Sequence, residues 1–188
     1  SSDVCSSDLT LIFTWDTTAP TVDAGTAASY NAQFTQNGSV GDATTITWSQ
    51  QSGPGTVSFG TANAASTTVQ MDTDGVYVLL LSVSDALGNS NSATVTITWD
   101  TTAPVVTVGG DLAVNTSQAI NATATDTNAM TYLWQQTAGP GSCSFTSTTT
   151  EDTTVSSCDT EGAYTLRLTV TDEAGNSNSD SLSFTWDT

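Results

Sequence analysis

One phrase of seven residues recurs at domain-sized intervals and divides the chain. It reads Thr-Trp-Asp-Thr-Thr-Ala-Pro at 14–20 and again at 98–104, and its first four residues return at 185–188. A phrase that returns at such intervals marks the junction between tandem copies of one domain. The sequence therefore predicts two repeats, at 16–99 and 100–187.

Each repeat is a succession of short alternating segments separated by Gly, Asn and Asp turns, with no helical period. In the segment 76–84, for example, Tyr77, Leu79 and Leu81 share one face. About seven such strands in a domain of this size are typical of a sandwich with one core. We predict an all-β fold of two tandem Ig-like Greek-key β-sandwiches, with one early strand over 29–34 and all five Trp side chains facing inward.

The first fifteen residues fall outside this repeat plan. Residues 1–9 resemble the translation of a sequencing adapter, and we treat 1–8 as a non-native or flexible leader. Residues 9–15 alternate like the last strand of each repeat. Their apolar face consists of Leu9, Leu11, Phe13 and Trp15. We predict an orphan strand that either ends a preceding repeat or adds to a sheet edge in its own chain or in another copy.

The charge balance excludes several functions. The chain has 19 acidic residues, one basic residue (Arg167) and no His, for a net charge of −18. Such a surface repels nucleic acid and anionic membranes and attracts cations. No segment is long and apolar enough for membrane insertion. Without His there is no Ser-His-Asp or Cys-His catalysis, and we predict that the chain is not an enzyme.

Two motifs in each repeat resemble a known family. Residues 48–55 and 134–141 resemble the Trp-x-Gln-x-Ser-Gly-Pro signature of PKD-like domains, and 75–85 and 162–172 resemble that family's Gly-x-Tyr-x-Leu-x-Leu-x-Val-x-Asp strand. Residues 172–176, with the Asp-Thr-Thr-Ala-Pro linker, resemble bacterial Ig-like adhesin repeats. The resemblance implies an extracellular tandem array that spaces, adheres or assembles. Tyr77 and Tyr164 resemble the tyrosine corner of Ig-type sandwiches.

Two of the three cysteines occupy aligned core positions. Cys143 stands where the first repeat has Val57, and Cys158 where it has Met71. Because both members of the pair change together, we predict a disulfide between neighbouring strands, which requires an oxidising, extracellular setting. The alternative is two buried thiols that replace apolar residues.

The acidic turns suggest calcium, which takes six to eight oxygen ligands at flexible geometry. No cofactor is required by the sequence, and the alternative is that Asp, Asn and Gly serve only as turn formers. The candidate ligands are Asp16, Asp72, Asp74, Asp85, Asn89, Asp100, Asp159, Glu161, Asp172 and Asn176.

Outward positions supply two further sets of candidates. Ile12, Val76, Val78 and Leu80 are apolar where the second repeat is mostly polar, which predicts either a contact surface or burial under a neighbouring strand. Asn37, Asn115 and Asn121 begin N-glycosylation triplets, so glycans are candidate modifications.

These features together predict a structural repeat unit of an extracellular bacterial fibre or surface filament. Its partners would be copies of itself or neighbouring repeats, joined through strand addition and domain–domain contacts. One alternative is the stalk of a cell-surface adhesin. The other is an accessory domain of a secreted hydrolase.

Overall fold

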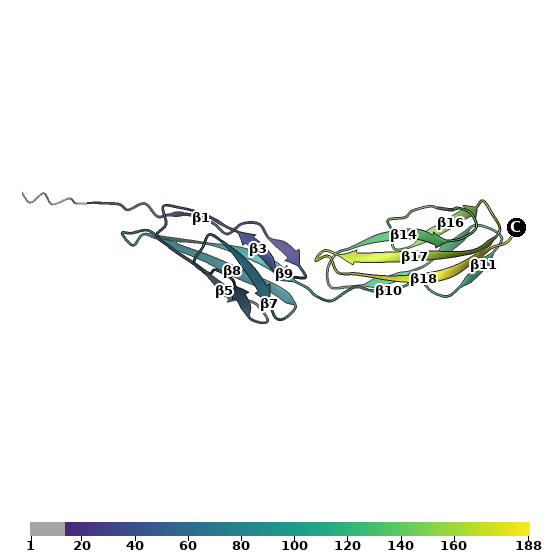
Figure 1. Cartoon of the computed structure of the whole chain (residues 1–188), viewed down its shortest axis with the longest axis horizontal. Coiled ribbons are helices and arrows are strands. Elements are labelled where there is room, and N and C mark those ends of the chain that lie inside the picture. The colour runs from purple at the N-terminus through teal and green to yellow at the C-terminus, as the bar shows by residue number, and fades with distance from the viewer. Residues whose placement is uncertain (1–13) are drawn as a thin grey trace, which may run out of the picture.

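The computed structural model describes residues 14–188 as two β-sandwiches arranged end to end (Figure 1). Domain 1 consists of β1 (Thr21–Asp23), β2 (Ala28–Tyr30), β3 (Phe34–Asn37), β4 (Ser39–Gly41), β5 (Thr45–Ser52), β6 (Val57–Phe59), β7 (Ser66–Met71), β8 (Gly75–Ser84) and β9 (Ser90–Trp99). Domain 2 consists of β10 (Val105–Thr107), β11 (Leu112–Val114), β12 (Gln118–Ile120), β13 (Thr123–Thr125), β14 (Met130–Ala138), β15 (Cys143–Phe145), β16 (Thr153–Cys158), β17 (Gly162–Asp172) and β18 (Ser177–Trp186). No helix occurs within residues 14–188, and so none there could cross a membrane.

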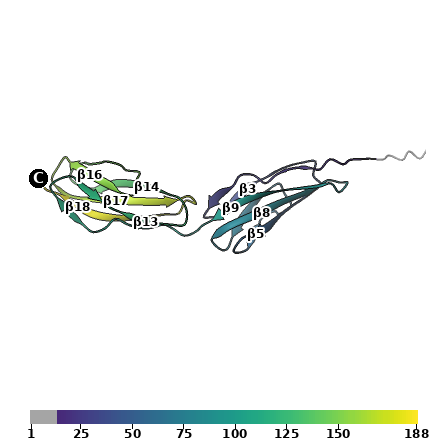
Figure 2. The same ribbon diagram turned by 180° about the vertical axis from the view of Figure 1, so that it is seen from behind.

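The two domains share one topology, which confirms the predicted all-β tandem fold. One sheet of domain 1 has the order β2-β9-β8-β5, with β2 parallel to β9, and faces the β3-β7-β6 sheet; β1 pairs with β4. Domain 2 repeats this arrangement as β11-β18-β17-β14, β12-β16-β15 and β10-β13. The view from behind in Figure 2 shows the long strands of domain 2 running close to the long axis of the molecule and those of domain 1 inclined to it. The predicted boundary near residue 100 falls in the connection between β9 and β10.

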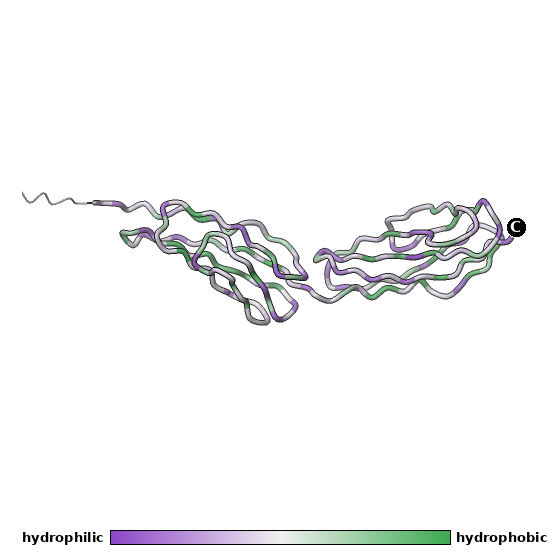
Figure 3. The backbone as a smooth tube through the Cα atoms, viewed as in Figure 1, coloured by the Kyte–Doolittle hydropathy of each residue, from purple (hydrophilic) through white to green (hydrophobic). Residues whose placement is uncertain are grey.

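The core of each domain follows from the period-two alternation of its strands. Tyr77, Leu79 and Leu81 of β8 are fully buried, while the residues between them face outward. Figure 3 shows apolar and polar residues alternating along the strands of both domains. Burial of one strand face against the opposite sheet supplies most of the stabilising free energy of such a sandwich.

The family signature holds one turn against the core tyrosine. The side-chain amide of Gln50 donates to the carbonyl of Gly55 at 2.7 Å and its oxygen accepts from the backbone N–H of Val57 at 3.1 Å. A Cβ at Gly53, where φ is +149°, would lie 2.2 Å from the ring of Tyr77, so only glycine fits there. The predicted tyrosine corners are present: Tyr77 and Tyr164 each donate to a backbone carbonyl four residues earlier.

Cys143 and Cys158 form the predicted disulfide. They lie directly opposite each other on the neighbouring strands β15 and β16, with sulfur atoms bonded and Cα atoms 4.0 Å apart. Val57 and Met71 occupy the same register in domain 1. The alternative of two free thiols is therefore wrong for this structure.

Two expectations about strands were wrong. The segment 29–34 is two strands rather than one, because the chain bends after Tyr30 and crosses from one sheet to the other before Phe34; Ala32 is exposed in this bend. Trp15 is 87% exposed, whereas the other four Trp side chains are buried as predicted. Trp15 has no strand beside it among the described residues. Leu9, Leu11, Ile12 and Phe13 lie outside the described residues.

Candidate functional site at the domain junction

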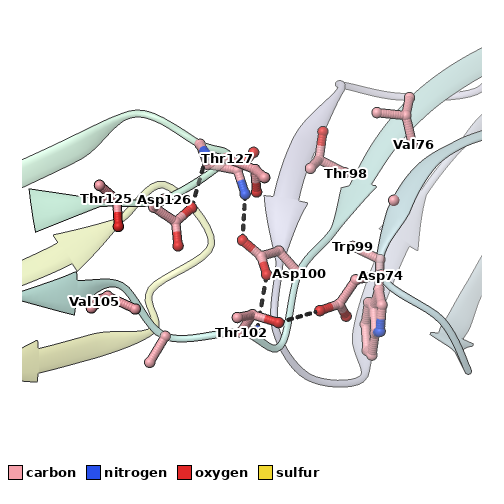
Figure 4. Close-up of a pocket in the computed structure, with 13 residues that line it drawn as sticks. Asp74, Val76, Thr98, Trp99, Asp100, Thr102, Val105, Thr125, Asp126 and Thr127 are labelled. Atoms are coloured by element: carbon pink, nitrogen blue, oxygen red, sulfur yellow. Dashed lines mark hydrogen bonds between the residues drawn. The ribbon is translucent and has the colours of Figure 1, made fainter.

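The linker between the domains is fastened to domain 1 by a carboxylate. Asp74, in the turn before β8, accepts hydrogen bonds from the backbone N–H and the hydroxyl of Thr101 at 3.0 and 2.9 Å, and from the hydroxyl of Thr102 at 2.8 Å. The backbone N–H of Asp100 donates to the carbonyl of Tyr30 at 3.0 Å. The linker therefore leaves domain 1 along a path set by specific bonds (Figure 4).

The same linker is held from the other side by domain 2. The Asn176 side chain, in the loop between β17 and β18, donates to the carbonyl of Asp100 at 2.8 Å, and Asn178 donates to the carbonyl of Pro104 at 3.0 Å. Asn31 of domain 1 donates directly to the side-chain oxygen of Asn176 at 3.1 Å. Hydrogen bonds from two directions restrict the freedom of a short connection.

The start of domain 1 contains the same device. Asn89 donates to the carbonyl of Asp16 at 3.0 Å, and Asn91 donates to the carbonyl of Pro20 at 2.9 Å. Each domain therefore uses the loop before its last strand, together with the start of that strand, to hold the segment that leads into the domain. Because the same hydrogen bonds occur at the start of both domains, they are a regular feature of the repeat.

Three carboxylates meet at the junction between the domains. Asp100, Asp126 and Asp172 each place an oxygen within 4.8 Å of the others, and Asp100 and Asp172 are 4% and 6% exposed. Asn128 donates to the carboxylate of Asp100. Like charges this close repel each other in a partly buried site. A divalent cation bound by oxygen ligands would remove that repulsion, and the donor set suits calcium.

The structure thus brings together only part of the predicted ligand set. Asp100, Asp172 and Asn176 lie at the junction, and Asp126 joins them although the sequence had not indicated it. Its signal was present: Asp42 stands at the equivalent position of domain 1, after the strand that pairs with β1. Asp16, Asp85 and Asn89 lie together at the start of domain 1.

The other predicted ligands fasten turns instead. Asp72 accepts hydrogen bonds from the hydroxyl and the backbone N–H of Thr56. These bonds hold the pKa of Asp72 below its ordinary value of 3.8, and the bond from the hydroxyl has the larger effect. Asp159 accepts from the backbone N–H of Ser142 at 2.8 Å. Glu161 accepts from Thr188 at 3.0 Å. None of these three carboxylates belongs to the cluster of Asp100, Asp126 and Asp172, and each holds a turn or the chain end through its hydrogen bonds.

Hydrogen bonds also shift the pKa of one carboxylate at the junction, Asp74, and of one at the start of domain 1, Asp85. Partial burial alone would raise the pKa of Asp74, but the bonds from Thr102 and Thr101 outweigh it and hold the pKa below 3.8. The side-chain amide of Asn89 is the main cause that lowers the pKa of Asp85, helped by backbone N–H groups of the same loop. Both carboxylates are therefore stabilised in the charged form that their donors require.

The predicted contact surface is only partly open. Val76 is 57% exposed, whereas Val78 and Leu80 are half-buried on the outer face of β8. Val76 and Val105, which is 65% exposed, line a groove of about 640 Å³ between the domains. The groove places an apolar surface beside the acidic cluster (Figure 4). The three candidate glycosylation residues, Asn37, Asn115 and Asn121, are exposed.

The fold and the repeated junction define a tandem Ig-like β-sandwich protein. The sequence matches the family described as K319L-like, PKD domain, over residues 21–98 and again over 108–185, and the chain belongs to this family. No curated protein matched the sequence. Tandem PKD and Ig-like domains are typical of extracellular or surface proteins, and the disulfide also indicates a secreted or extracellular protein.

Solved structures are also similar to the chain, and the one with a TM-score above 0.5 supports the fold alone. An I-band fragment of titin, I67–I69, is similar with a TM-score of 0.52 and 17% identity over 91% of this chain and 66% of the fragment, so the chain spans less than two thirds of it. The PKD domain of the KIAA 1837 protein is 23% identical, with a TM-score of 0.38, over 46% of this chain and 91% of that domain. Fibronectin(III)-like modules of Clostridium thermocellum CbhA are 12% identical, with a TM-score of 0.46, over 89% of this chain and 94% of theirs.

Proposed function

We propose that the chain is a structural repeat segment of an extracellular bacterial fibre or surface filament, with domains held end to end. The observation that carries this proposal is the linker held from both sides. Asp74 fixes its Thr residues to domain 1, and Asn176 fixes Asp100 to domain 2. A spacer needs such a connection because loose linkers let domains bend back on each other.

The proposal retains strand addition by residues 9–15 as the route of assembly. Trp15 supports this, since a large aromatic side chain that is 87% exposed is suited to burial against a partner. The position of a last strand is already filled by β9 and β18 in the two described domains. An incoming strand would therefore add beside an edge strand, such as β5 or β14, or complete a further domain.

We also propose that calcium stiffens the junction through Asp100, Asp126 and Asp172. Isothermal titration of the full chain with calcium chloride tests this. Asp126→Asn is the informative variant, because its carboxylate has no described role in holding the linker, and Asp152→Asn is a control in domain 2 away from the junction. Heat of binding lost in the first variant and kept in the second supports the site; equal heats in both reject it.

Electron microscopy of the purified full chain tests the fibre itself, with and without calcium and beside a chain that lacks residues 9–15. Filaments that form only when residues 9–15 are present support strand-mediated assembly. Separate two-lobed particles in every condition reject it and favour the alternative of an adhesin stalk. A catalytic domain elsewhere in the same gene would favour the accessory domain of a secreted hydrolase.

A further inference from the structure

We infer that the end of domain 2 formed by Asn115, Glu161 and Asp187 is a docking face for the start of a further domain of this kind, namely a second copy of domain 1. This inference rests on the proposed structural role, and it identifies the surface of domain 2 that would contact the next domain of the repeat array.

Asn115 occupies the position of the residue that bridges the existing junction. Tyr30 pairs with Trp99 at the end of β9, and Val114 pairs with Trp186 at the end of β18. The next residues along the chain are Asn31 and Asn115, which are therefore equivalent. Asn31 is the residue of domain 1 that donates to Asn176 of domain 2.

The end of domain 2 also reproduces the bonds that direct the linker. The backbone N–H of Asp187 donates to the carbonyl of Val114 at 3.0 Å, as Asp100 does to Tyr30. Thr188 donates through its backbone N–H and its hydroxyl to Glu161 at 3.0 and 3.1 Å, as Thr101 does to Asp74. The chain therefore leaves domain 2 in the direction in which it leaves domain 1.

Residues at the end of domain 1, which domain 2 follows, are more buried than their equivalents at the end of domain 2. Asp100 is 4% exposed and Asn31 is half-buried, because domain 2 lies against both. Asn115, the equivalent of Asn31 beside the last strand, is exposed. It therefore has room for the cover that domain 2 gives to Asn31.

The complementary half of the junction lies at the start of domain 1. Asn89 donates to the carboxylate of Asp85 at 2.8 Å and to the carbonyl of Asp16 at 3.0 Å. Asn176 makes the equivalent bonds to Asp172 and Asp100, both at 2.8 Å. The side-chain oxygen of Asn89 is thus placed to accept from an Asn115 as that of Asn176 accepts from Asn31. Two complementary ends on one elongated molecule make a heterologous contact that repeats without closing.

A chain in which residues 1–186 are followed directly by residues 16–188 tests the docking face, with Cys5→Ser to remove the unpaired cysteine. This joins Trp186 to Asp16 and recreates the linker phrase. Asn115→Cys in the first copy is combined with Asn89→Cys in the second. The positive control is Asn31→Cys with Asn176→Cys within one copy, and the negative control replaces Asn89→Cys by Ser58→Cys, an exposed residue of β6.

If the domains dock, the disulfide between Asn115→Cys and Asn89→Cys should form at least about tenfold faster than the one between Asn115→Cys and Ser58→Cys. Contact between the domains raises the effective concentration of the two thiols. Equal rates would overturn the inference. Residual dipolar couplings of the same chain without the paired cysteines provide a second measurement. The third domain should have the orientation to the second that the second has to the first, and independent tumbling would overturn the inference.

These results are separable from the fibre test. Both measurements report on one junction inside one chain, produced in a host that leaves Asn115 unglycosylated. A docked third domain with no filaments from the natural chain would reject only the fibre. Filaments together with an undocked third domain would reject only the docking face.

Discussion

Replacing the disulfide by the pair that domain 1 holds at the same register isolates what the covalent bond contributes. The double variant Cys143→Val and Cys158→Met, in a Cys5→Ser background, places in domain 2 the residues found at 57 and 71. Those residues already pair across neighbouring strands in domain 1. The variant therefore retains an apolar cross-strand contact and loses only the link.

The expected loss follows from the length of chain that the bond closes. The two cysteines are 15 residues apart, and closing a loop of that length lowers the entropy of the unfolded chain by an amount worth about 3 kcal/mol of folding free energy. One kcal/mol shifts the Tm of a domain of this size by about 4–8 °C, so the transition of domain 2 should fall by about 12–24 °C.

Differential scanning calorimetry of the two-domain chain measures this, since domain 1 provides an internal reference within the same molecule. Reducing the parent protein with dithiothreitol should lower the same transition by a similar amount. The reciprocal variant, Val57→Cys with Met71→Cys, should raise the transition of domain 1. A loss under about 1 kcal/mol in domain 2 would refute the loop-closure reasoning, because the entropy of the closed loop predicts about three times that.

Three further outcomes are expected. Gly53→Ala should destabilise domain 1 by about 2–4 kcal/mol in urea titrations because its Cβ meets the Tyr77 ring, whereas Gly110→Ala, with open space around it, should change little. Tyr77→Phe should cost about 1 kcal/mol in the same titrations by leaving a backbone carbonyl without its donor. The lowered pKa values of Asp74 and Asp85 contribute stability that is present above about pH 4 and is lost as the pH falls through the pKa values of the folded state. The difference in unfolding free energy between the parent and Asp85→Asn should therefore shrink from pH 6 to pH 2. A constant difference would contradict the lowered pKa of Asp85.

The features that the sequence predicted well are determined by a short stretch of residues or recur in both repeats. The strands from β8 to β9 carry an unbroken period of two, and the glycine and tyrosine of the signature act on each other across one turn. The disulfide could also be predicted, because aligning the repeats placed both cysteines at the positions of two residues that pair in domain 1. In each case a short stretch, or its copy, contains the physical reason for the structure.

The bend between β2 and β3 was hidden because it preserves the alternation. Tyr30 and Phe34 both face the core and their rings stack with centroids 3.7 Å apart, although their strands belong to opposite sheets. Because three residues connect the two sheets here, Tyr30 and Phe34 are separated by an even number of positions and the alternation continues unbroken. The pattern of apolar residues therefore could not distinguish one strand from two.

The sequence predicted two members of the carboxylate cluster, Asp100 and Asp172, and missed Asp126, because the three come from separate segments. Asp100 belongs to the linker, Asp126 follows β13 and Asp172 ends β17. Nothing near Asp126 distinguishes it from other turn-forming aspartates. Only the recurrence of an aspartate at 42, together with the antiparallel pairing that places it beside the linker, would have identified it.

The Trp of the repeated phrase shows what the sequence of a strand leaves undetermined. Trp99 and Trp186 are 5% and 7% exposed, and Trp15 is 87% exposed, although all three stand before the same Asp-Thr. The two buried residues end strands that lie between a parallel neighbour and the long central strand of a sheet. Alternation decides which face of a strand is apolar, but burial also requires a neighbouring strand on either side and an opposite sheet over that face. Among the described residues Trp15 lacks the burial that β2 and β8 give to Trp99, and under the proposed strand addition a partner would supply that burial.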